Sequence, residues 1–116
     1  MSERSPTLHI FLMLRSTPAW LALSRQARAD YIAEAVRPLF EKYPPRSSRF
    51  FDAEAFSGRC SDILLIEVDD LRRYGFLIDA LRDEAFLGLP YFQVVDVIPT
   101  LEDSYRDYDA ETGVAA

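Results

Sequence analysis

The chain has little of what many metal-binding and catalytic proteins display. Its 116 residues include one cysteine, Cys60, one histidine, His9, and four glycines. A lone cysteine excludes an internal disulfide, and four scattered glycines form no phosphate-binding loop. No HExxH or EF-hand spacing is present. We therefore predict no bound metal and no bound cofactor, haem included, since His9 is the only candidate imidazole.

Long apolar runs and clusters of positive charge are also missing. The longest runs, IFLML and ILLI, fall well short of the roughly 20 residues that cross a bilayer. The apolar run near the N-terminus is short for an export signal, and Arg15 interrupts it. The net charge of −6 comes without a Lys/Arg cluster that would attract phosphates. We expect a cytoplasmic protein that binds neither membranes nor nucleic acids.

Hydrophobic periodicity predicts six elements in the order strand, helix, strand, strand, helix, strand. The first helix begins after Thr17 and carries Pro38 inside it, so a kink is expected near residues 34–37. Asp69 or Asp70 caps the second helix. The four strands are expected at residues 7–14, 49–55, 62–68 and 91–98.

This order is typical of the α+β class with ferredoxin-like βαββαβ topology, in which two helices cover one face of a four-stranded antiparallel sheet. Residues 1–98 are predicted to form that single domain. Residues 99–116 have clustered acids and no apolar period, so we expect a partly disordered acidic tail.

Two helices cover only one face of such a sheet. Strand alternation assigns the more aliphatic set to the helices: Leu8, Ile10, Leu12, Leu14, Phe51, Ala53, Ala55, Leu64, Ile66, Val68, Val95 and Val97. The opposite set is too apolar to leave in water and too acidic for an ordinary core: His9, Phe11, Met13, Phe50, Asp52, Glu54, Ile63, Leu65, Glu67, Phe92, Val94, Asp96 and Ile98.

Pairing of two copies, sheet to sheet, satisfies both properties. The homodimer would be a dimeric α+β barrel whose facing sheets enclose a ligand cavity. Its candidate catalytic residues are His9, Asp96 and Glu67, with His9 and Asp96 as an acid–base pair. Its candidate ligand-binding residues are Phe11, Met13, Phe50, Asp52, Glu54, Leu65 and Phe92. The alternatives are that the acids point to solvent, or pair with Arg15, Arg49 or Arg59.

Several stretches resemble one family across residues 7–108. RFFDAEAFSGRCSDILLIEVDDL and PYFQVVDVIPTLEDSYRDY are the most specific, and TPAWLALSRQAR and LIDALRD accompany them in the same order. Together they resemble the darcynin family of bacterial proteins. The family is functionally uncharacterised, so the resemblance implies no catalytic residues.

Two functions remain open from the sequence. The first is a cofactor-independent protein that binds or transforms a small, mainly apolar organic molecule, in the manner of a monooxygenase or isomerase. The second is a non-enzymatic dimeric module that binds a ligand or a protein. The absence of a compact catalytic motif favours the second, and the aromatic lining beside carboxylates favours the first.

Overall fold

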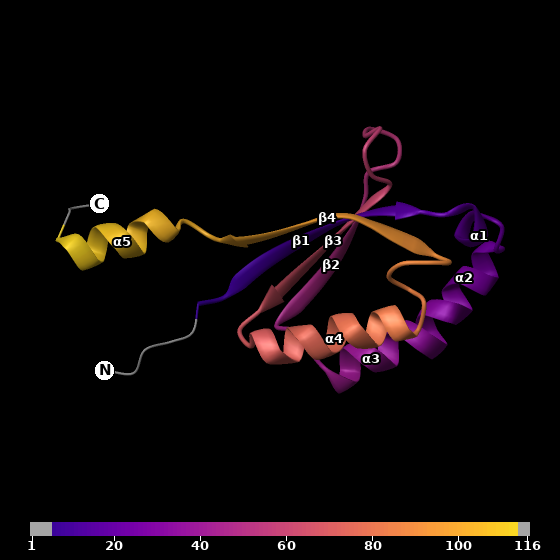
Figure 1. Cartoon of the computed structure of the whole chain (residues 1–116), viewed down its shortest axis with the longest axis horizontal. Helices are drawn as coiled ribbons and strands as arrows, with labels where there is room; N and C mark the ends of the chain where they lie inside the picture. Colours follow the sequence, from indigo (N-terminus) through magenta and orange to yellow (C-terminus); the bar gives the residue numbers. More distant parts are fainter. Residues whose placement is uncertain (1–5, 114–116) are drawn as a thin grey trace.

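The computed structural model describes residues 6–113, in which four strands and several helices follow the expected order (Figure 1). The elements are β1 (Leu8–Ser16), α1 (Pro18–Leu21), α2 (Arg25–Tyr31), the π-helical turn η1 (Ile32–Val36), α3 (Arg37–Lys42), β2 (Ser47–Asp52), β3 (Asp62–Val68), α4 (Leu71–Asp83), β4 (Phe92–Leu101) and α5 (Ser104–Thr112).

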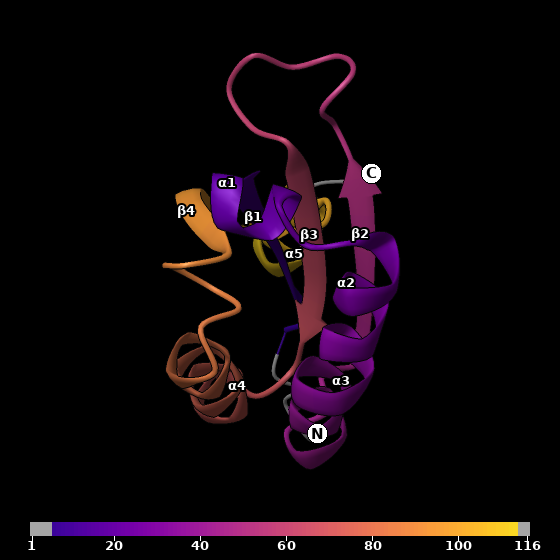
Figure 2. The same ribbon diagram turned by 90° about the vertical axis from the view of Figure 1, so that its right-hand side faces the viewer.

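The strands form one antiparallel sheet in the order β2-β3-β1-β4. Helices α3 and α4 lie side by side beneath one face of this sheet, and α2 rises from that layer toward α1, which lies at one end of the sheet (Figures 1 and 2). The predicted ferredoxin-like α+β fold is therefore confirmed. We call the face that no helix covers the open face.

Local signals in the sequence fix where the helices begin. The hydroxyl of Thr17 accepts a hydrogen bond from the backbone N–H of Trp20, and that of Ser24 accepts one from Ala27. The carboxylate of Asp70 accepts from the backbone N–H groups of Arg72 and Arg73. Each cap satisfies N–H groups that a first helical turn leaves unpaired. Thr17 and Asp70 confirm the predicted starts.

The expected irregularity before Pro38 is a π-helical turn. At η1 the N–H of Arg37 bonds to the carbonyl of Ile32, five residues back instead of four. Proline has no N–H and its ring crowds the preceding turn, so a wider turn placed just before Pro38 accommodates it. The helix therefore continues as α3 without a break.

The core lies between the sheet and the helices. Its buried members come from all layers: Ile10, Leu12, Leu14, Val36, Leu64, Ile66, Val68, Leu77, Leu81, Phe86, Leu87 and Phe92. Burial of each large apolar side chain contributes about 1.5–3 kcal/mol before the entropy of ordering is subtracted. The β1 and β3 residues expected to face the helices are all in or against this core.

The predicted faces of β2 were wrong. β2 spans Ser47–Asp52 rather than residues 49–55, and Phe50 pairs with Leu64, which faces the helices. Because side chains alternate with a period of two, a shift of one residue inverts the strand. Phe50 and Asp52 therefore point toward the helices and Phe51 toward the open face. Ala53 and Ala55 belong to the loop that follows.

Strand β4 changes face along its length. Met13 pairs with Asp96 but Leu14 pairs with Val94, so Val95 is an extra residue that forms a β-bulge. On the N-terminal side of the bulge, Phe92 and Val94 turn into the core, where Phe92 is only 2% exposed. Their assignment to the open face was wrong, whereas Asp96 and Ile98 do lie there. Val97 pairs with Leu12 on the helix side, as expected.

The end of the chain is more ordered than predicted. Strand β4 continues through Pro99 to Leu101, which an edge strand permits because no further strand needs the missing N–H. Helix α5 follows and ends at Gly113, whose φ of 80° suits glycine. Residues 114–116 of the predicted tail lie outside the described part. Within residues 6–113, no helix has both the length and the apolarity to cross a membrane.

Candidate ligand-binding site

A cavity of about 640 Å³ lies between the helix-covered face of the sheet and the helical segment that runs from α1 to α3. Its helical wall consists of Trp20, Leu21, Arg28, Ile32, Val36, Arg37 and Phe40. Its sheet wall consists of Ser16, Ser48, Arg49, Phe50, Asp52, Asp62, Leu64 and Phe92, and Glu54 and Phe86 complete the lining. A drug-sized organic molecule fits a volume of this order.

The apolar end of the cavity is built around Phe92. The Phe92 ring centroid lies 5.0 Å from that of Trp20, 5.1 Å from that of Phe86 and 6.1 Å from that of Phe50. Tilted and edge-on aromatic contacts of this kind add stability beyond burial alone. The bulge at Val95 makes this cluster possible, because it turns Phe92 inward. The result is a rigid aromatic surface for an apolar ligand.

The polar end holds two carboxylates on adjacent strands. Asp52 and Asp62 are direct cross-strand partners, and both project to the helix side. Glu54 lies two residues beyond, where its backbone N–H donates to Asp52 Oδ1 at 3.0 Å. Like charges opposite one another across a strand pair destabilise the sheet. Charges that destabilise the fold but line a cavity often serve in binding or catalysis, and this is what the two aspartates suggest.

Asp62 is held in a defined position by its neighbour. The Ser61 hydroxyl donates to Asp62 Oδ2 at 2.7 Å and accepts from the backbone N–H of Ser16 at 2.7 Å. Burial raises the pKa of Asp62, and the nearby charges of Asp52 and Glu54 raise it further, against the opposing effect of the Ser61 hydrogen bond. A carboxyl group with a raised pKa is a better proton acceptor than an exposed one.

The arginines near the cavity do not neutralise these acids. Arg28 donates to the carbonyls of Trp20 and Leu21 at 3.1 and 2.9 Å. Arg49 lies over the Phe51 ring at 5.5 Å, and Arg15 donates to the carbonyl of Arg59. Within residues 6–113 no ion pair involves Asp52, Glu54 or Asp62. The ion-pair alternative for Asp52 and Glu54 is therefore wrong, whereas both residues are exposed, as the alternative of acids that point to solvent expected.

The predicted site residues fall into two separate places. Phe50, Asp52, Glu54 and Phe92 line the cavity, but from the helix side and within one protomer, not between two sheets. Phe11, Met13 and Leu65 lie on the open face, as predicted. The expected proximity of the Asp52–Glu54 pair to Glu67 is wrong, because Glu67 lies on the opposite face.

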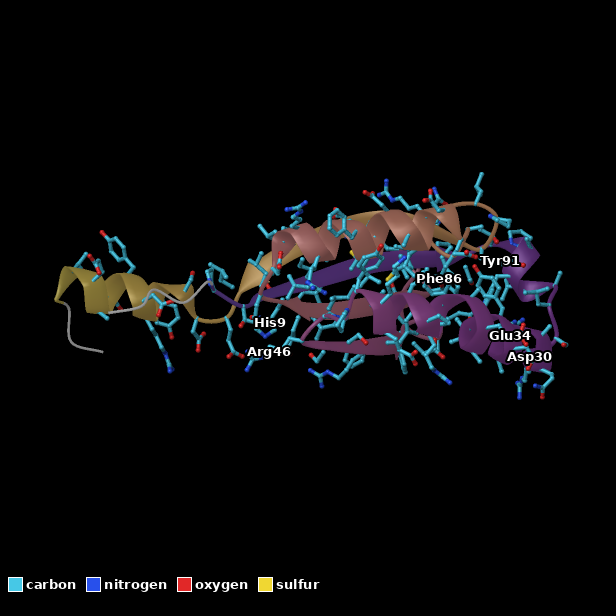
Figure 3. All side chains as sticks on the ribbon, turned by 90° about the horizontal axis from the view of Figure 1, so that it is seen from below. His9, Asp30, Glu34, Arg46, Phe86 and Tyr91 are labelled. Atoms are coloured by element: carbon cyan, nitrogen blue, oxygen red, sulfur yellow. The ribbon has the colours of Figure 1, made fainter. Side chains whose placement is uncertain are left out.

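His9 and Glu67 form a small polar site of their own on the open face. His9 Nε2 lies 3.5 Å from Glu67 Oε1, and the side chains are about one-quarter exposed. Asp96 pairs with Met13, four residues along β1 from His9, which corresponds to about 13 Å of strand. The proposed His9–Asp96 acid–base pair is therefore not assembled within a protomer. Figure 3 shows His9 at the opposite end of the sheet from Phe86.

Sequence reasoning missed Asp62, Trp20, Phe40 and Phe86. Asp62 could have been predicted, since a hairpin that joins the two strands places it directly opposite Asp52 in the β2–β3 pairing. The helical and loop residues carry no such signal, because only the folded layers bring them together. Across residues 6–113, no group of three or more His, Cys, Asp or Glu side chains is arranged to hold a metal ion.

The fold and the cavity define a class: an antiparallel α+β protein of ferredoxin-like topology with a ligand-sized pocket between its layers. The sequence profile of the darcynin family, described as a domain of unknown function, matches residues 1–116. The chain therefore belongs to the darcynin family, which confirms the resemblance. It is 46% identical over 90 residues to darcynin 1 of Acinetobacter baumannii, covering 78% of this chain and 100% of the relative. It is 49% identical over 76 residues to a darcynin of Chromobacterium violaceum, covering 66% and 96%.

Two solved structures show the same fold at low sequence identity. A mutant chlorite dismutase from Candidatus Nitrospira defluvii superposes with a TM-score of 0.67 at 13% identity, over 86% of this chain and 41% of that chain. HapK from Hahella chejuensis superposes with a TM-score of 0.56 at 10% identity, over 82% and 91%. The chain spans less than half the length of the chlorite dismutase. At these identities the likeness concerns the fold alone.

Proposed function

We propose that this protein binds a small, mainly apolar organic molecule in the cavity between sheet and helices. Asp62 exchanges a proton with the polar group of that molecule. The observation that carries this proposal is the cavity itself, with aromatic rings at one end and Asp52 and Asp62 at the other. Pockets with an apolar lining and a few convergent polar groups are the usual form of small-molecule sites.

The electrostatics narrow the class of ligand. Unpaired carboxylates favour a partner that donates a hydrogen bond or a proton, such as a phenol O–H or an acidic C–H. A small inorganic anion such as chlorite fits poorly beside three carboxylates and would leave most of the cavity unfilled. We therefore do not extend the reaction named for the chlorite dismutase to this chain. The proposal uses side chains alone and needs no cofactor.

Binding can be followed through Trp20, which is the only tryptophan and lines the cavity. 4-Butylphenol and 4-butylanisole share an apolar body, but only the phenol donates a hydrogen bond. We expect the phenol to change Trp20 emission at lower concentration than the anisole, and Asp62→Asn to reduce that preference. Equal binding of both ligands by the wild-type protein would contradict the role of the carboxylates.

A pocket-filling variant tests the location. Ser48 points into the cavity, whereas its neighbour Ser47 pairs with Glu67 and points to the open face. Ser48→Phe is expected to abolish the response to both ligands, and Ser47→Phe to preserve it. Loss of binding in both variants, or in neither, would argue against this cavity as the site.

A test of proton transfer distinguishes an enzyme from a protein that only binds its ligand. 2-Tetralone is an apolar bicyclic ketone with an acidic C–H that exchanges slowly with deuterium oxide, which proton NMR measures. If Asp62 acts as a base, the wild-type protein accelerates this exchange and Asp62→Asn loses the acceleration. Binding of 2-tetralone without acceleration would refute proton transfer and favour the non-enzymatic binding module.

We also propose that two copies pair through the open face. Its side chains include Phe11, Met13 and Ile63, which are partly exposed in a single copy, and Ile98, which is 42% exposed. Among the described residues His9 Nδ1 is buried without a hydrogen-bond partner, which a second copy over that face can supply. A homodimer of this kind would be an α+β barrel.

Light scattering at micromolar concentration is expected to give twice the chain mass of 13.3 kDa. Ile98→Arg places a charge on the open face and should produce monomers. Leu71→Arg replaces an exposed leucine on α4, away from that face, and should leave the dimer intact. A monomeric wild-type protein would refute the pairing.

A further inference from the structure

The C-terminal arm, defined here as residues 102–112, extends away from the body of the protein (Figure 1). It contains α5, whose Tyr105 and Tyr108 are 60% and 69% exposed. A nine-residue helix is marginal in water without a surface to pack on, because helix nucleation is costly. The arm therefore lacks, within one protomer, the contacts that would hold it.

The size of the molecule supports the same conclusion. The radius of gyration is 16.9 Å, whereas a compact domain of this length has about 13.4 Å. The accessible surface is 8134 Å², about 1,600 Å² above the roughly 6,500 Å² typical of a compact monomer of this mass. A standard interface buries about 800 Å² per partner. The excess is enough for the open face and an arm contact together.

A second exposed feature stands at the other end of the sheet. The β2–β3 loop (residues 53–61) rises on the open-face side, opposite the helices, and carries Phe56, which is 92% exposed (Figure 1). A hydrogen bond from the Arg15 guanidinium to the carbonyl of Arg59 ties this loop to β1. Arg15 and Arg59 are both exposed and supply two cations beside a bare aromatic ring, although Asp52 and Glu54 at the same end of the sheet are exposed as well.

The arm carries acidic side chains that can pair with Arg15 and Arg59. It holds five carboxylates and one arginine, a net charge of −4, and Arg106 already lies 3.7 Å from Asp103. The chain is 56 Å long, with the arm and the loop toward opposite ends of that axis (Figure 1). A two-fold axis in the plane of the open face, perpendicular to the strands, brings the arm of each copy to the loop of the other.

We infer that the C-terminal arm docks on the β2–β3 loop of a second copy, with Tyr105 and Tyr108 against Phe56 and the acids of α5 against Arg15 and Arg59. This rests on the pairing of open faces proposed above. Because such a contact is isologous, it occurs twice per dimer, and each copy both donates an arm and receives one.

Cross-linking between two different single variants tests the contact. In a Cys60→Ser background, Phe56→Cys and Tyr108→Cys proteins are mixed, unfolded, refolded together and oxidised mildly. A disulfide between the two variants can only join different copies, and a covalent dimer on a non-reducing gel is the expected result. Leu89→Cys, also highly exposed, replaces Tyr108→Cys in the control and should yield far less.

Charge reversal gives a second measurement. Arg59→Glu should weaken the dimer roughly 2- to 30-fold, as two exposed charge contacts are worth, and adding Asp107→Arg should restore it. A wild-type dimer by light scattering with no cross-link and no effect of Arg59→Glu would overturn the arm contact while the face pairing stands. A wild-type monomer would overturn both.

Discussion

Replacing Asp62 by asparagine is expected to stabilise the protein at neutral pH. Its carboxylate is half-buried and faces Asp52 across the strand pair, so burial and the charges of Asp52 and Glu54 raise its pKa. Asparagine keeps an oxygen that accepts the Ser61 hydrogen bond and removes the charge. The substitution therefore removes an unfavourable interaction and retains a favourable one.

The size of the gain follows from the cross-strand geometry. Directly opposed charges change stability by roughly 0.2–1 kcal/mol. In a domain of this size about 1 kcal/mol shifts Tm by about 4 °C, so Asp62→Asn should raise Tm by roughly 1–4 °C at pH 7. Asp52→Asn relieves the same repulsion. The double variant should therefore gain less than the sum of the two single variants.

The pH dependence has a definite sign. The folded-state pKa of Asp62 lies above its unfolded value, so the charged form costs stability in the wild-type protein. That cost is present at neutral pH and disappears as the pH falls through the folded pKa toward about 3.9, the unfolded value. The advantage of Asp62→Asn should therefore be largest at pH 7 and small near pH 4.

Thermal melts followed by circular dichroism at both pH values test this reasoning. Asp79→Asn, at an exposed aspartate on α4, is the matched control and should change Tm little at either pH. A loss of stability in Asp62→Asn at pH 7, or a gain of equal size at pH 4, would refute the repulsive-pair account.

Three further outcomes are expected. Phe92→Ala should lower the free energy of unfolding by about 3–5 kcal/mol in chemical denaturation, because it leaves a void in the aromatic cluster. Val95→Ala, at the exposed bulge, should lower it by well under half of that, and the reverse ranking would contradict the bulge. Tyr31→Phe should lower the free energy of unfolding by about 1 kcal/mol, since the Tyr31 hydroxyl donates to the carbonyl of Glu84 and joins α2 to the end of α4. An unchanged midpoint of urea unfolding would count against that hydrogen bond. Addition of EDTA should leave Tm unchanged, and a clear fall would contradict the prediction that no metal is bound.

The elements that sequence predicted well are those whose signals are local. The alternation in β1, the caps at Thr17 and Asp70, and the irregularity before Pro38 all depend on residues within one turn or one strand. The order of the elements then restricts the topology to few choices. This is why the α+β class and the two helices on one face could be predicted.

The elements that sequence predicted poorly depend on register between strands. RFFD alternates equally well in either of two phases, and only the pairing of Phe50 with Leu64 selects one. The bulge at Val95 leaves no mark in a run of apolar residues, yet it decides where Phe92 points. Both errors displaced the cavity from the helix side to the open face, which is why its aromatic and acidic residues were predicted but its position was not.

The bulge at Val95 also limits how the chain can change in evolution. Phe92, before the bulge, lines the cavity, whereas Asp96 and Ile98, after it, lie on the open face, so substitutions at these positions affect different surfaces. A deletion of one residue there would restore a regular pairing and rotate Phe92 and Val94 out of the core. We therefore expect darcynins to accept insertions and deletions in the β2–β3 loop far more readily than at this single position of β4.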